Sequence, residues 1–129
     1  GLLGLSGISG DIRDLEEAAA QGKARAKLAL DVFVAEIRRH LGGLLVELGG
    51  VDVIVFTAGI GAHSAEVRQR ICEASAWLGL QLDRAANDAH ATCISAPGSK
   101  VSAWMIPTNE ELMIARHTGR LLSLVGANP

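Results

Sequence analysis

A pair of glycines follows the short apolar run Val51–Phe56. Because glycine has no Cβ, Gly59 and Gly61 allow a positive φ and let a ligand come close to the backbone. Ser64 can cap a helix that begins near Ala65. The free N–H groups and the positive dipole end of such a helix start favour an anion. The pattern therefore predicts a phosphate-binding turn of the kind that holds nucleotides.

The glycine spacing does not establish this site by itself. Gly-Ile-Gly is only part of a G-x-G-x-x-G pattern, and no G-x-x-x-x-G-K-[ST] motif occurs in the chain. An ordinary strand-to-helix turn remains the alternative interpretation.

A second group of charged residues follows the glycine-rich segment Gly1–Gly10, which we expect to be a partly buried loop. Asp11 can cap a helix that runs to about Ala20, and Arg13 follows in its first turn. The ordinary interpretation is a cap and a solvated charge, and the functional one is a binding segment.

A third candidate is Glu110, at the start of the last predicted helix. Thr108 and Glu111 fit a T-x-x-E capping box, which leaves Glu110 without a capping role. A carboxylate just beyond the C-terminal end of a strand lies where open α/β sheets bind ligands, and it can hold Mg²⁺ beside phosphates. The alternative is a charge that stabilises the helix dipole.

The other candidate ligands do not form a set. His90 and Cys93 have no second His/Cys pair to complete a tetrahedral metal site, and His40 is expected to be an exposed or capping residue. Cys72 and Cys93 are too few for a disulfide framework, which favours a reducing compartment and hence the cytoplasm.

Two longer helices must position these residues. Helical spacing of apolar residues predicts one from Lys23 to about Leu48 and another from Ala65 to Leu78. Gly42-Gly43 inside the first suggests close packing against another element. Cys72 and Trp77 are expected to pack inward from the second.

The alternation of predicted helices and strands indicates an α/β fold, with a mixed sheet flanked by helices. Val51–Phe56 is short and rich in β-branched residues, so we expect a strand buried on both faces. Thr92–Ser95 and Val101–Ile106 read as two strands joined by a turn at Pro97-Gly98, which adds an antiparallel element.

Composition limits the function further. With 129 residues, of which 49% are hydrophobic, the chain is expected to form one domain. The chain has a net charge of -2, and its basic residues form neither a stripe nor a polybasic patch. We therefore expect neither nucleic acid nor membrane as a partner. Because it begins with Gly1 rather than methionine, we expect it to be part of a longer protein.

Three motifs together resemble one family. They are Ser6-Gly7-Ile8-Ser9-Gly10-Asp11-Ile12-Arg13-Asp14-Leu15, Val55-Phe56-Thr57-Ala58-Gly59-Ile60-Gly61-Ala62-His63-Ser64 and Ile106-Pro107-Thr108-Asn109-Glu110-Glu111-Leu112-Met113-Ile114-Ala115-Arg116. This set is similar to the C-terminal third of acetate kinases, in the acetate/propionate kinase family of the sugar kinase, Hsp70 and actin superfamily. The resemblance runs from Gly4 to about Leu122 and implies part of a ribonuclease H-like domain.

The resemblance implies transfer of the ATP γ-phosphoryl group to acetate, giving acetyl phosphate and ADP, with Mg²⁺. By position, one nucleotide-binding segment corresponds to Asp11, Ile12 and Arg13. Glu110 corresponds to the magnesium-associated glutamate. Such residues bind nucleotide and metal and do no nucleophilic chemistry, so no catalytic residue is expected in this chain. The second nucleotide-binding segment corresponds to Gly59, Ile60, Gly61, Ala62 and His63.

Two departures from the family matter. After Gly-Ile-Gly the family usually has Glu-Asn, whereas this chain has Ala62-His63, which leaves its nucleotide preference open. Family members are also about three times as long, a two-domain size. We therefore expect residues 1–129 to be a C-terminal nucleotide-binding domain without the N-terminal domain that holds acetate, and to be inactive alone.

Other functions remain possible at this stage. The family's C-terminal domain makes a homodimer interface, so the chain is expected to form a homodimer and could serve only as an assembly module. Alternatively, the acid acceptor could be propionate or butyrate, which the other domain would select.

Overall fold

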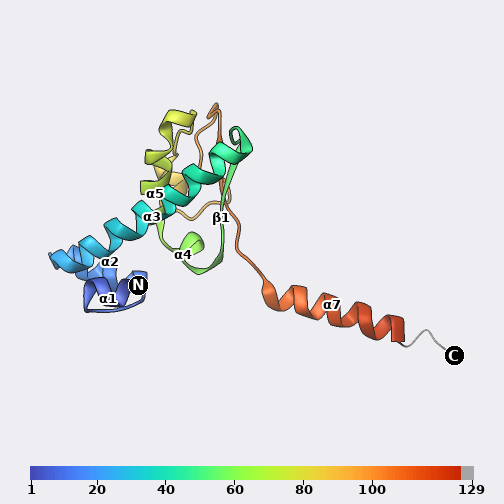
Figure 1. The fold of residues 1–129 in the computed structure, drawn as a ribbon. Helices are drawn as coiled ribbons and strands as arrows, with labels where there is room; N and C mark the ends of the chain where they lie inside the picture. The colour runs from blue at the N-terminus through green and yellow to red at the C-terminus, as the bar shows by residue number, and fades with distance from the viewer. Residues whose placement is uncertain (126–129) are drawn as a thin grey trace.

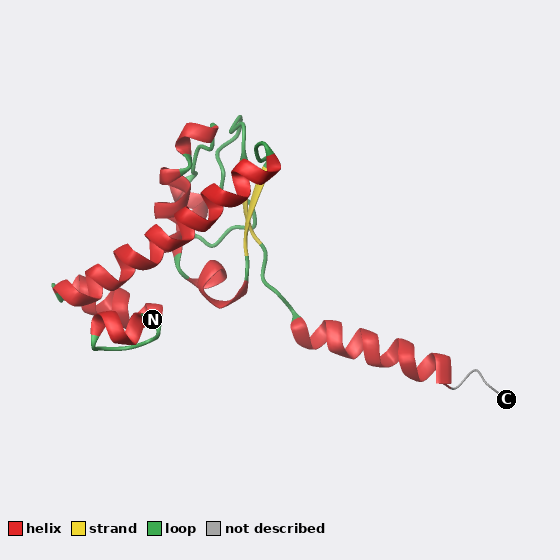
Figure 2. Ribbon diagram, viewed as in Figure 1, coloured by secondary structure: helices red, strands yellow, loops and turns green. Residues whose placement is uncertain are grey.

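The computed structural model describes residues 1–125. The sequence also predicts a frayed tail from Gly126 to Pro129, which lies outside the described residues. Helices and strands alternate along a body from which the last helix projects (Figure 1 and Figure 2). The elements are α1 (Leu2–Ser6), α2 (Ile12–Ala20), α3 (Ala24–Leu48), β1 (Val53–Phe56), α4 (Ala58–His63), α5 (Ala65–Ala74), η1 (Ala76–Leu78), α6 (Arg84–Asp88), β2 (Ser102–Met105) and α7 (Glu110–Val125).

The described strands form a two-stranded parallel sheet, and the antiparallel part of the predicted mixed sheet appears only as isolated bridges. β1 pairs in parallel with β2, with Val53 opposite Ser102. An antiparallel bridge joins Cys93 to Trp104, and the Ile94 N–H donates to Ala103 O at 2.9 Å. The predicted antiparallel pairing is therefore confirmed, although the segment around Cys93 forms bridges rather than a full strand.

The core lies between the sheet and the long helices. α2 packs along the first part of α3, and α5 packs on the middle of α3 (Figure 1). The apolar side chains that fill this space are mainly aliphatic, with Phe56, Cys72 and Met105 among them. The fully buried ones include Leu15, Ala26, Ala29, Ile94 and Ala103.

The N-terminal segment is a short helix instead of the predicted loop. α1 ends at Gly7, whose φ of +66° is the left-handed conformation that glycine allows at a helix end. Arg25 on α3 donates from Nε and Nη2 to Leu5 O, at 3.1 and 3.0 Å. The long-range bond to α3 explains why local composition did not predict the helix.

Three burial predictions are wrong. β1 is not buried on both faces, because its outward side chains Val53 and Val55 have no covering layer among the described residues. Trp77 is 75% exposed, since α5 ends at Ala74 and a separate 3-10 turn carries the tryptophan. Gly42-Gly43 is not closely packed, because a Cβ at either glycine would meet no atom of the described residues within 4 Å.

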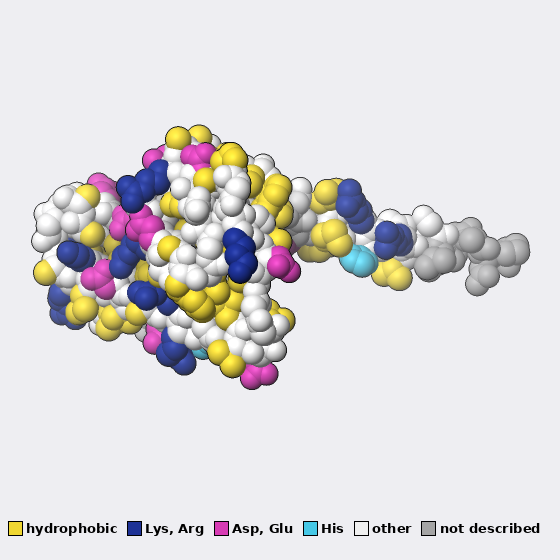
Figure 3. All heavy atoms as spheres, turned by 90° about the horizontal axis from the view of Figure 1, so that it is seen from above, with side chains coloured by type: hydrophobic (Ala, Val, Ile, Leu, Met, Phe, Trp, Pro, Cys, Tyr) yellow, Lys and Arg dark blue, Asp and Glu magenta, His cyan; other side chains and the backbone are white. Residues whose placement is uncertain are grey.

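The last helix, α7, extends away from the body (Figure 1 and Figure 3). Its start differs in detail from the sequence prediction. Asn109 Oδ1 accepts from the Leu112 N–H at 2.9 Å, so Asn109 is the capping residue and the predicted Thr108–Glu111 capping box is wrong. Along the described chain, no helix combines the length and apolar character needed to cross a bilayer.

Candidate functional site

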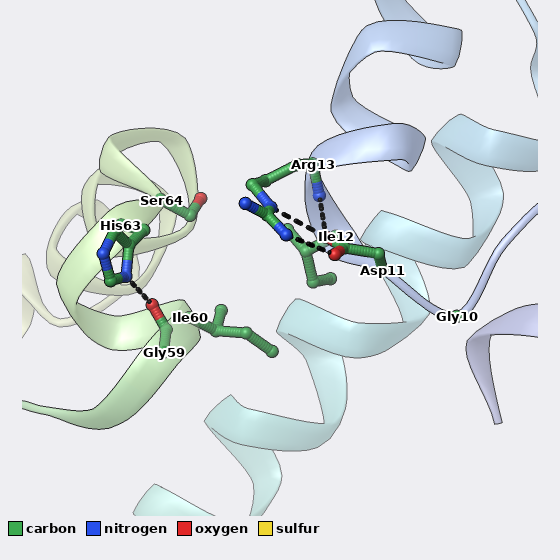
Figure 4. A pocket seen from close by; sticks show the side chains of 8 residues that line it. All are labelled: Gly10, Asp11, Ile12, Arg13, Gly59, Ile60, His63 and Ser64. Carbon is green, nitrogen blue, oxygen red and sulfur yellow. Dashed lines mark hydrogen bonds and ion pairs between the residues drawn. The ribbon is translucent and has the colours of Figure 1, made fainter.

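A cavity of about 390 Å³ opens between two parts of the chain (Figure 4). One wall is the start of α2, and the other is α4 together with Ser64, the residue that precedes α5. The cavity joins two of the three predicted segments, which are about fifty residues apart in the sequence. Its lining residues are Gly10, Asp11, Ile12, Arg13, Gly59, Ile60, His63 and Ser64. Gly61 and Ala62 belong to the same helix but do not line the cavity.

The α2 wall carries a carboxylate and a guanidinium that bind each other. Asp11 caps α2, because its Oδ1 accepts from the Arg13 N–H at 2.9 Å. The Arg13 side chain also donates from Nη2 to Asp11 Oδ2 at 2.7 Å and from Nε to Oδ1 at 3.2 Å. Arg13 is 79% exposed, so its outer N–H groups remain accessible to an anion in the cavity (Figure 4).

The carboxyl group of Asp11 should titrate at unusually low pH. The Arg13 side-chain hydrogen bond, with the bond from its backbone N–H, lowers the pKa of Asp11 from 3.8 to about 2. Because the folded-state pKa is the lower one, the contribution of this pair is complete above pH 3.8 and is lost as pH falls through about 2.

This pH dependence is measurable by an NMR titration of the side-chain carboxyl carbons. We expect the Asp11 signal to remain that of the carboxylate at pH 3.5. In the Arg13→Ala variant its midpoint should return toward 3.8. A wild-type midpoint near 3.8 would contradict the pairing seen here.

The α4 wall uses its glycines differently from the prediction. Neither Gly59 nor Gly61 has a positive φ; instead Ala58 takes φ +58° at the start of α4. A Cβ at Gly61 would lie 3.3 Å from the backbone carbon of Phe56, so this glycine permits close packing of α4 on the end of β1. Gly59 is open, since a Cβ there would meet nothing within 4 Å.

Two side chains of α4 give this wall its chemistry. Ile60 is 38% exposed and points into the cavity (Figure 4). His63 Nδ1 lies 2.6 Å from Gly59 O, and a carbonyl oxygen only accepts, so Nδ1 carries the proton and donates. The wall thus offers an apolar contact and an imidazole of defined orientation.

Ser64 connects the two walls, a role that the sequence did not predict. Its Oγ accepts from the Val67 N–H at 3.0 Å, which confirms the predicted cap of α5. The same hydroxyl donates to Glu16 Oε1 on α2. No local pattern indicates the bond to Glu16, because the partners are 48 positions apart.

Glu110 lies outside this cavity. It is exposed in the first turn of α7, and α7 extends away from the body (Figure 1). Within residues 1–125, no three His, Cys, Asp or Glu side chains gather to hold a metal ion. The described structure therefore does not bring the third predicted segment to the other two.

Comparison with known proteins identifies relatives over nearly the whole chain. The model of the Acetokinase family matches residues 1–116. The acetate kinase of Rhodopseudomonas palustris (strain TIE-1) is 55% identical over 123 residues, covering 94% of this chain and 30% of that protein. The acetate kinase of Heliobacterium modesticaldum is 49% identical over 123 residues, covering 95% and 31%. This chain thus spans about 30% of the length of these curated relatives.

Solved structures show the same relationship. The acetate kinase of Porphyromonas gingivalis aligns with a TM-score of 0.86 and 38% identity, over 95% of this chain and 31% of that one. A propionate kinase from Francisella tularensis aligns with a TM-score of 0.81 and 36% identity, over 89% and 29%. The predicted α/β fold of the sugar kinase and actin type is confirmed by this likeness. The chain belongs to the acetokinase family.

Proposed function

We propose that this chain is the nucleotide-binding part of a cytoplasmic kinase that transfers the γ-phosphoryl group of ATP to acetate, giving acetyl phosphate and ADP. Family membership supports the reaction class. The observation that carries the proposal for this chain is the cavity between α2 and α4, because it unites both predicted nucleotide-binding segments. Acetate would bind to a domain outside residues 1–129.

The two walls suit different parts of a nucleotide. Ile12 and Ile60 supply apolar contacts for a base or ribose, and Arg13 supplies a cation for phosphate oxygens. Asp11 orients that cation by binding two of its nitrogens. In phosphoryl transfer a protein mainly positions groups and neutralises charge, which is the work these residues would do.

Magnesium belongs to the proposal through Glu110. Mg²⁺ usually takes one or two carboxylates together with substrate phosphates and water. Asp11 is the acidic residue among those lining the cavity, and both of its oxygens already accept from Arg13. The lining residues alone therefore do not fit a magnesium site, and Glu110 would contribute only where α7 is placed near the bound phosphates.

Two features favour additional proposals. The structural likeness to a propionate kinase makes propionate a second candidate acceptor, with butyrate as a longer homologue of the same class.

Exposed apolar side chains support a homodimer, since such patches are typical of protein contacts. They gather on the outer face of the sheet and at the end of α3: Leu44, Val46, Leu48, Val53, Val55 and Trp104.

Nucleotide binding can be tested by isothermal titration of ADP with Mg²⁺ into the chain. We expect Arg13→Ala to weaken binding about tenfold or more, because hydrogen bonds to charged groups contribute about 1.5–3 kcal/mol. The matched control is Arg39→Ala. Arg39 is also exposed and pairs with a neighbouring carboxylate, Glu36, at 2.7 Å, but it lies away from this cavity.

The outcomes separate clearly. Binding that weakens in Arg13→Ala and not in Arg39→Ala supports the proposed site. Equal affinity in the wild type and in both variants would place the nucleotide elsewhere, and no binding by the wild type would contradict the proposed function of this chain.

A further inference from the structure

Arg68 on α5 is completely buried. Four hydrogen bonds join its N–H groups to carbonyl or amide oxygens, and among the described residues it forms no ion pair with a carboxylate. Nη1 donates to Gly61 O at 3.0 Å and to Ala62 O at 2.9 Å. On the other side, Nε donates to Asn87 Oδ1 at 2.8 Å, and Nη2 donates to Asn87 O at 2.9 Å and lies 3.2 Å from His90 Nδ1.

The bonds to Gly61 and Ala62 matter because of where these carbonyls lie. They are in the last turn of α4, where carbonyl groups have no partner within the helix and carry the negative end of its dipole. A guanidinium there satisfies both and places a positive charge at the favourable end. Burial lowers the pKa of Arg68.

α4 needs such support. It has only six residues, far fewer than an isolated helix requires in water. Thr57 at its start makes no side-chain capping bond, and Ala58 begins it with a positive φ. The close packing of Gly61 on Phe56 is another anchor.

On its other side, the Arg68 guanidinium is held by a buried residue, Asn87. Asn87 is completely buried and donates from Nδ2 to Ala65 O at 2.9 Å. This amide ties α6 to the first turn of α5. The guanidinium therefore joins α4 to a rigid point rather than to a loop.

We propose that Arg68 is a positioning residue for nucleotide binding: by clamping the end of α4 to α6, it holds Gly59, Ile60 and His63 in the geometry that forms one wall of the cavity. It touches no ligand itself, since it does not line the cavity. This role rests on the proposed function, because it assigns a purpose to the wall that would contact the nucleotide.

The test compares Arg68→Lys with Arg70→Lys in the 129-residue chain. Lysine keeps the charge but has three donors on one nitrogen, so it cannot bridge α4 and α6. Arg70 lies on the same helix and pairs with Asp31 at 2.6 Å on the surface, away from this cavity. Amide hydrogen exchange is followed in residues 58–64 and, as a reference, in residues 12–20.

In Arg68→Lys, exchange in 58–64 should accelerate about tenfold or more while 12–20 stays unchanged, as expected for losing hydrogen bonds from a charged group. ADP affinity should fall by a similar factor. Arg70→Lys should leave both values within about twofold, as expected for a partly exposed pair that keeps its charge. Wild-type exchange rates in 58–64 of a folded Arg68→Lys chain would overturn the proposal.

A second measurement decides the matter if Arg68→Lys does not fold. Coupling between clamp and nucleotide must be reciprocal, so saturating ADP should slow hydrogen exchange of the Arg68 Nε–H in the wild type. An unchanged Nε–H rate with ADP bound would overturn the proposal. If the wild type binds no ADP, the proposed function fails, whereas the comparison of exchange in 58–64 still decides whether Arg68 holds α4.

Discussion

Replacing Leu15 with alanine is expected to lower the free energy of unfolding by about 2–5 kcal/mol. Leu15 is 0% exposed and lies in the core cluster between α2 and α3. Its truncation removes apolar burial and leaves a cavity that the surrounding helices can fill only in part. Because α2 also carries Asp11 and Arg13, the change should loosen one wall of the candidate site.

Urea unfolding followed by circular dichroism measures this loss. The matched control is Leu28→Ala, because Leu28 is 53% exposed on α3 and its truncation should change stability by no more than about 0.5 kcal/mol. If Leu15→Ala unfolds at the same urea concentration as Leu28→Ala, the packing of α2 on α3 described here is incorrect.

Replacing Gly79 with alanine is expected to destabilise the chain by about 2–5 kcal/mol in total. Gly79 follows η1 with φ +88°, a conformation that costs about 1–2 kcal/mol for an L-residue. A Cβ there would also lie 2.9 Å from Lys100 Cβ, which is fixed to the backbone and cannot swing aside. Relieving that overlap adds about 1–3 kcal/mol.

Gly98→Ala separates the two contributions. Gly98 has a nearly identical φ of +85°, but a Cβ there would meet nothing within 4 Å. Thermal or urea unfolding should therefore show only the conformational cost in Gly98→Ala and a clearly larger loss in Gly79→Ala. Equal losses would mean that Gly79 and Lys100 are not in contact.

Local features were readable from the sequence because they depend on neighbours in the chain. The Asp11 and Ser64 caps are confirmed, since each accepts from a backbone N–H two or three residues away. The long helix predicted over Lys23–Leu48 is confirmed as α3, because its apolar spacing is regular. Family membership followed from motifs for the same reason, as they are short and continuous.

The candidate site was only partly readable. The sequence named Asp11–Arg13 and Gly59–His63, and both segments do line one cavity. It misjudged the glycines within the second segment, because only packing on Phe56 shows that Gly61 serves close approach between elements. Its helical pattern also gave no sign that Arg68, a charged side chain, is fully buried.

The sequence by itself therefore determined the caps of α2 and α5, the long helix α3 and the family. Only the tertiary structure decided that Arg68 is buried, that Trp77 is exposed and that Glu110 lies outside the cavity. The physical reason is the range of the interactions involved. Caps and helical periodicity act within a few residues, whereas burial and the walls of a cavity depend on segments tens of residues apart meeting in space.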